Sequence, residues 1–90
     1  MLHSRNTVKA LFAPNINISS ASYLGCAVYN ISRKVDRNEF FVGSLVIADR
    51  EFFTLNMVTA TGTEVHTGNG FIELSDKLQE LKLLHEDARS

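Results

Sequence analysis

Alternating apolar and polar positions in the middle of the chain predict two paired strands. Residues 39–48 and 52–60 are rich in β-branched and aromatic side chains, which pack well on a pleated surface. The second segment places one set of apolar side chains on a single face: Phe53, Leu55 and Met57. Because the charged residues 49–51 separate the two segments by only a tight turn, we predict an antiparallel hairpin.

The N-terminal third has less decisive patterns. Residues 6–13 fit either a helix or a strand, and we favour a strand. Residues 14–22 form a loop or a short edge strand. The aromatic and β-branched content of residues 23–32 favours a strand, with a helix beginning near Ser20 as the alternative. Residues 33–38 are interpreted as a polar connection.

The C-terminal third changes its period from two to about 3.6 residues. Residues 61–63 are a predicted turn and 64–66 a short strand, while Asn69-Gly70 is a favoured hairpin-turn dipeptide. The apolar positions then recur with helical spacing at Leu74, Leu78, Leu81, Leu84 and Ala88. Ser75 or Asp76 is the expected N-cap.

These elements predict a single α+β domain over residues 1–90. Its mainly antiparallel sheet has about 4–6 strands, with one C-terminal amphipathic helix packed on it. A domain of 90 residues has a thin stability margin. This is a first reason to expect a homodimer.

Composition excludes several kinds of chemistry. The single cysteine, Cys26, excludes an internal disulfide and a cysteine-rich zinc site, and it resembles a buried small hydrophobic residue in a reduced cytoplasmic protein. No apolar run is long enough to cross a bilayer. We find no catalytic set and no metal-ligand spacing, so we expect neither an enzyme nor a cofactor.

A basic loop is the first candidate for binding. Arg33, Lys34 and Arg37 could hold a phosphate group, because guanidinium groups bind oxyanions through two hydrogen bonds. His66 and Asn69, in the glycine-rich segment 62–70, are the candidates that would complete a ligand site. The simpler interpretation is a solvated hairpin loop, since Asp36 and Glu39 offset part of its charge.

The charge is divided unevenly along the chain. Residues 1–48 carry a formal charge of +3 and residues 49–90 carry −4, for a net charge of −1. Five basic residues without a Lys/Arg stripe are a weak signal for nucleic acid. We therefore expect no nucleic-acid partner and interpret the surface as an ordinary mixed one.

Two pairs of adjacent phenylalanines provide the second candidate. Neighbouring residues in a strand point to opposite faces, so one ring of Phe40-Phe41 and one of Phe52-Phe53 should enter the core. The others should lie on a second apolar face that one helix cannot cover. Either the N-terminal segment or a protein partner, including a second copy of the chain, would bury that face.

The sequence thus favours a small non-catalytic intracellular protein that binds through a sheet face or dimer interface. An accessory or inhibitor protein of a mobile genetic element is one role open to such a domain. The alternative is a binding module for a nucleotide or another small phosphate-containing ligand, built on the basic and glycine-rich loops.

Overall fold

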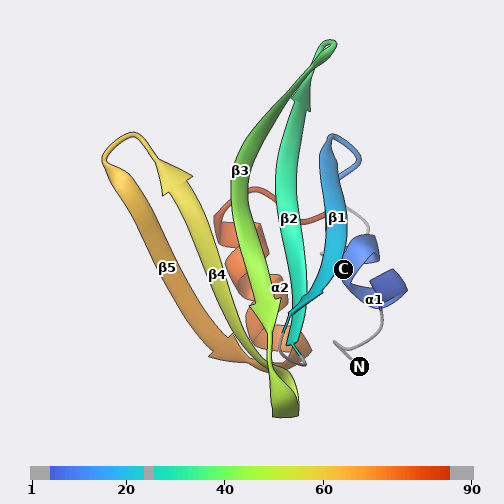
Figure 1. The fold of residues 1–90 in the computed structure, drawn as a ribbon, viewed down its shortest axis with the longest axis vertical. Coiled ribbons are helices and arrows are strands. Elements are labelled where there is room, and N and C mark those ends of the chain that lie inside the picture. The colour runs from blue at the N-terminus through green and yellow to red at the C-terminus, as the bar shows by residue number, and fades with distance from the viewer. Residues whose placement is uncertain (1–4, 24–25, 86–90) are drawn as a thin grey trace.

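The computed structural model describes residues 5–23 and 26–85, which form a five-stranded antiparallel sheet and two helices (Figure 1). In chain order the elements are α1 (Arg5–Leu11), β1 (Ile16–Tyr23), β2 (Cys26–Val35), β3 (Asn38–Ile47), a short 3-10 turn (Asp49–Glu51), β4 (Phe52–Thr59), β5 (Gly62–Asn69) and α2 (Gly70–Glu80). The strands lie in the sheet in the same order as in the sequence. The predicted α+β class, with a C-terminal helix on an antiparallel sheet, is confirmed.

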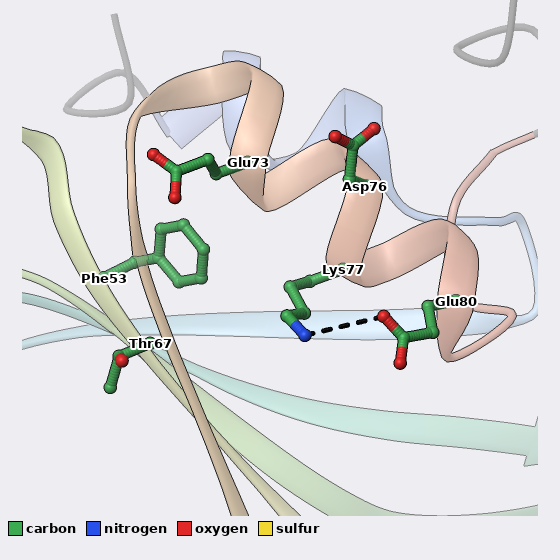
Figure 2. A pocket seen from close by; sticks show the side chains of 6 residues that line it. All are labelled: Phe53, Thr67, Glu73, Asp76, Lys77 and Glu80. Atoms are coloured by element: carbon green, nitrogen blue, oxygen red, sulfur yellow. Dashed lines mark hydrogen bonds and ion pairs between the residues drawn. The ribbon is translucent and has the colours of Figure 1, made fainter.

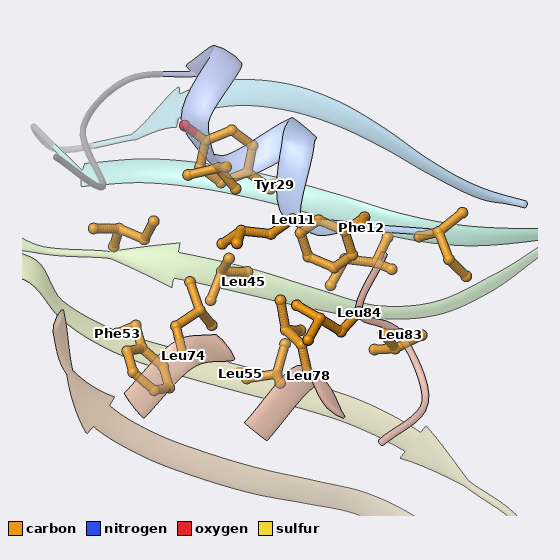
Figure 3. Packing of buried hydrophobic residues seen from close by; sticks show 14 of the residues in the cluster. Leu11, Phe12, Tyr29, Leu45, Phe53, Leu55, Leu74, Leu78, Leu83 and Leu84 are labelled. Carbon is orange, nitrogen blue, oxygen red and sulfur yellow. The ribbon is translucent and has the colours of Figure 1, made fainter. Parts of the chain in front are cut away.

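The hydrophobic core lies between one face of the sheet and the helices. Every second side chain of the central strands is buried there, among them Leu45 of β3 and Leu55 of β4, and Leu74 and Leu78 of α2 pack against them (Figure 3). The predicted β3–β4 hairpin is confirmed, with Leu45 paired to Leu55. The alternation therefore assigns one face of the sheet to the core and leaves the other face outward.

The prediction of a strand over residues 6–13 is wrong, because this segment forms α1. Val8, Leu11 and Phe12 are at most 4% exposed and join the same core cluster as α2. Val8 and Leu11 satisfy helical spacing and lie on one side of α1, and Phe12 follows directly after its last residue. α1 therefore packs on the helix side of the sheet. The alternative in which the N-terminal segment covers the opposite face is wrong for this helix.

Backbone hydrogen bonds tie the two ends of the described chain together. The Ala13 N–H donates to the Leu83 carbonyl over 2.9 Å, and the His85 N–H donates to the Leu11 carbonyl over 2.7 Å. Leu83 and Leu84 are buried in the same core cluster as α1. This short pairing closes the helix side of the core, where the sequence predicted a continuing helix.

The turn predicted at Asn69-Gly70 is instead the junction of β5 and α2. Asn69 is extended, and its Nδ2 donates to the Arg50 carbonyl over 2.8 Å, so the amide fastens this junction to the 3-10 turn. Gly70 supplies the positive φ of 89° at which the chain changes direction. The helix consequently begins at Gly70, well before the expected N-cap at Ser75 or Asp76. Ala88 lies outside the described residues.

The polar connection that the sequence predicted over residues 33–38 is shorter in the structure. β2 extends to Val35 and β3 begins at Asn38, so only Asp36 and Arg37 form the turn. Inside this hairpin the register shifts: Ile31 pairs with Gly43, but Ser32 pairs with Phe41. Val42 is the extra residue of a β-bulge. The segments predicted at 14–22 and 23–32 are the strands β1, at the sheet edge, and β2.

Candidate functional site

The side of the sheet opposite the helices is its outer face, which is turned toward the viewer in Figure 1. Two rows of paired residues cross it from β1 to β5. The first row consists of Ser19, Asn30, Ser44, Asn56 and Val65, and the second of Ala21, Val28, Val46, Thr54 and Thr67. We use the name outer face for these ten residues together with Phe41, Phe52 and Val58, which flank them.

The two rows contain hydroxyl, amide and aliphatic side chains and no charged one. Val58 and Val65 are 55% and 60% exposed. An outward face of an antiparallel sheet that meets only water usually carries charged and other strongly polar side chains. No described segment covers this face, because both helices contribute to the core on the other side.

Charged residues lie at the far end of the β2–β3 hairpin, which projects beyond the neighbouring strands in Figure 1. Lys34 and Glu39 are cross-strand partners there, and opposite charges in such a position attract. Arg37 lies in the exposed turn next to them. The charged residues therefore mark one end of the outer face and leave its centre uncharged.

The four phenylalanines divide differently from the prediction. Phe53 is fully buried and Phe52 is 46% exposed on the outer face, as the alternation requires. Phe40 and Phe41 are 54% and 58% exposed, so the prediction that one of them enters the core is wrong. The reason is their place in the projecting part of the hairpin, past the bulge at Val42, where β3 has no β4 partner.

The proposed ligand residues are distributed over the molecule. Arg33 is half-buried on the helix side of β2, with an Nε that has no hydrogen-bond partner among the described residues, whereas Lys34 and Arg37 are exposed near the hairpin tip. His66 lies on β5, and two strands separate β5 from β2. Asn69, at the end of β5, is engaged with the Arg50 carbonyl. The structure does not bring this set together.

Glu64 and His66 share the helix side of β5, as their spacing predicts. The distance between Glu64 Oε2 and His66 Nε2 is 3.8 Å, which is too long for a hydrogen bond. His66 Nε2 is shielded from water and has no hydrogen-bond partner among the described residues. This imidazole therefore has an unused polar atom on the strand at the sheet edge.

Cys26 stands at the start of β2, opposite Tyr23 of β1. Its side chain is half-buried rather than fully buried as the sequence suggested, and its thiol is free. The residue therefore belongs to neither the core cluster nor the proposed ligand set.

A pocket of about 250 Å³ lies between α2 and β5 (Figure 2). Its lining residues are Phe53, Thr67, Glu73, Asp76, Lys77 and Glu80. Lys77 Nζ lies 3.5 Å from Glu80 Oε2, so the lysine of this lining is already paired with one of its carboxylates. None of the proposed ligand residues lines this pocket.

Comparison of the chain with protein-family models, with curated proteins and with solved structures found no match. Within residues 5–23 and 26–85, no three His, Cys, Asp or Glu side chains are grouped so that they could hold a metal ion. In the same described part of the chain, neither helix has the length and apolar character to cross a membrane.

Sequence reasoning named the aromatic members of the outer face but missed its two rows. The signal was present in the strands, where Ser44, Thr54 and Asn56 alternate with buried apolar residues. Counting the charges among these outward positions would have found the uncharged surface. The pairing of five strands then assembles short polar and aliphatic side chains into one continuous area.

Proposed function

We propose that this chain is a small non-catalytic protein-binding domain, and that the outer face is the surface that contacts its partner. The observation that carries the proposal is the absence of charge from both rows of this face among the described residues. Depletion of charged residues is the compositional mark of the buried centre of a protein–protein interface.

The area of the outer face suits this role. The outer face comprises thirteen residues, and each outward residue of a sheet occupies roughly 4.8 Å by roughly 6.6 Å, so the face presents a flat area of roughly 400 Å² before corrugation is counted. A standard interface buries about 800 Å² on each partner. The face therefore supplies about half of one side of such an interface, and the side chains around it would supply the rest.

The mixed composition of the outer face indicates the class of partner. Hydroxyl and amide groups outnumber aliphatic ones in the two rows, whereas obligate homodimer interfaces are more apolar. The composition of the face therefore favours a separate protein that binds reversibly over a permanently bound second copy of the chain. Its matching surface should be flat and uncharged, because an unpaired charge buried against these rows would cost binding energy.

The experiment compares two variants that each add one negative charge. Asn56→Asp places a carboxylate in the middle of the outer face, and Gln79→Glu places one on the exposed side of α2. Each protein is used to capture partners from extracts of the native host, and the captured protein is purified for affinity measurement. We expect Gln79→Glu to bind like the wild type and Asn56→Asp to bind at least about tenfold more weakly.

Equal affinities for the two variants, with circular dichroism showing both folded, would overturn the proposal. The same measurement with Thr54→Asp repeats the test at the neighbouring row. Weaker binding by Gln79→Glu alone would indicate that the partner binds at α2 and not at the outer face.

A further inference from the structure

The outer edge of β5 offers a second binding surface, distinct from the outer face. β5 is the last strand of the sheet, pairs with β4 alone, and has no described element beyond it (Figure 1). Along that edge, alternate residues of Gly62–Asn69 have main-chain groups without a strand partner. The segment contains no proline or lysine, two of the residue types that proteins place on edge strands to prevent pairing, and Glu64 is its one acidic residue.

The opposite edge of the sheet is less open. α1 lies alongside β1 in both Figure 1 and Figure 3. Continuous pairing at β1 would have to accommodate the helix. The edge of β5 is therefore the better site for an added strand.

We infer that β5 pairs antiparallel with β5 of a second copy of this chain about a two-fold axis at Val65, which joins two sheets into one of ten strands. This inference goes beyond the proposed function and does not depend on it. In an antiparallel pair, opposite residues must lie on the same face. The axis can therefore pass through Val65, or through Glu64 or His66, but not between neighbouring residues.

Charge selects among these registers. With the axis at Val65, Glu64 lies opposite His66 of the second copy, and the reverse pair forms on the other side of the axis. Thr63 then faces Thr67, and the two Val65 side chains face each other on the outer side. Threonine pairs, aliphatic pairs and acid–base pairs are all favourable across neighbouring strands.

The neighbouring registers lose these partners. An axis at Glu64 places two carboxylates opposite each other and His66 opposite Gly62. An axis at His66 places two imidazoles opposite each other and Glu64 opposite Gly68. Like charges directly opposite destabilise a sheet. Of these three registers, the one at Val65 is also the one that places a carboxylate opposite His66.

Charge exchange tests this register. Sedimentation analysis of the intact wild-type chain should show a monomer–dimer equilibrium. Two single variants, Glu64→Lys, which opposes a lysine to His66, and His66→Glu, which opposes two carboxylates, should each weaken dimerisation at least about tenfold.

Mixing the two single variants should restore association as a heterodimer. The introduced lysine then meets the introduced glutamate of the other chain, while His66 of the first variant meets Glu64 of the second. Repulsion within one strand would not be relieved by mixing, so this result isolates the contact between chains.

Cysteine cross-linking tests the position of the axis. In a Cys26→Ser background, Val65→Cys should form a covalent dimer on mild oxidation. Val58→Cys is the matched control, since it has nearly the same exposure on the same face but lies on β4. Strong cross-linking through residue 58 would overturn the edge pairing in favour of face-to-face association. The edge pairing would also be overturned if the wild type stays monomeric up to high micromolar concentration, or if the mixture of Glu64→Lys and His66→Glu fails to associate. These outcomes do not depend on the result of the binding test with Asn56→Asp.

Discussion

Phe52 and Phe53 are adjacent in β4, but their side chains lie on opposite faces of the sheet and have different environments. Phe53 is fully buried, and its ring packs over Gly68 of β5, where an added Cβ would approach it to 2.6 Å. Phe52 is 46% exposed. The same residue type therefore contributes to the core at one position and to the outer face at the next.

We expect Phe53→Ala to lower the free energy of unfolding by about 3–5 kcal/mol, because it leaves a cavity where the ring was. Phe52→Ala is the control, and it should cost less than about 1 kcal/mol. Urea unfolding followed by circular dichroism measures both. Comparable losses at the two positions would mean that Phe52 is buried as well, and would contradict the alternation on which the outer face depends.

Lys82 has a backbone conformation that suits glycine. Its φ is 61°, and the following N–H of Leu83 donates to the Leu78 carbonyl over 2.8 Å, so Lys82 occupies the left-handed position that ends α2. A side chain in this conformation costs roughly 1–2 kcal/mol. Lys82→Gly should therefore stabilise the protein by roughly 1 kcal/mol, whereas Lys82→Ala, which keeps the Cβ, should not. A lower urea midpoint for Lys82→Gly than for Lys82→Ala would rule out this explanation.

Among the elements, α1 is the one that the sequence pattern misassigned. Its apolar residues Val8, Leu11 and Phe12 fit helical spacing, while Val8, Ala10 and Phe12 also alternate as in a strand. Tertiary packing decides between them, because Val8 and Leu11 of the helix and the following Phe12 are all buried in the cluster that α2 and the sheet share. A strand at this position would leave Leu11 on the opposite face.

This assignment can be tested with a charge on each side of α1. Val8→Asp places a carboxylate in the core and should cost more than about 3 kcal/mol, enough to unfold a small domain. Ala10→Asp, on the exposed side, should change stability by less than about 0.5 kcal/mol. In a strand, residues 8 and 10 would share a face, so equal effects in thermal unfolding would contradict the helix.

Other elements were predictable to different degrees. The β3–β4 hairpin followed from alternation alone, because both strands have one buried face. The bulge at Val42 did not, since one extra residue changes the face of everything before it without changing the composition. The junction at Asn69-Gly70 was misinterpreted because asparagine and glycine favour a hairpin turn and a helix start for the same conformational reasons.

At the scale of the whole molecule, the outer face and the β5 edge have complementary consequences. Sheet order places the two on the same layer, with Val65 belonging to both. A dimer through β5 would join two outer faces into one continuous uncharged surface, and a partner with two binding segments would then gain affinity from their linkage. The sequence alone could not indicate this, because neither surface exists before five strands are paired in order.

Dimerisation would also compensate for the small size of the domain, and this leads to a prediction for the intact protein. If folded chains associate and unfolded chains do not, the stability of the folded state rises with protein concentration. We expect the urea midpoint of the wild type to increase between about 1 and 100 μM, by an amount corresponding to about 1.4 kcal/mol per dimer for each tenfold step once the dimer predominates. Glu64→Lys should unfold with a midpoint that depends less on concentration, since it removes the carboxylate that lies opposite His66 across the seam. A constant wild-type midpoint over this range would show that the folded chain is stable alone, and that β5 does not supply stability through a second copy.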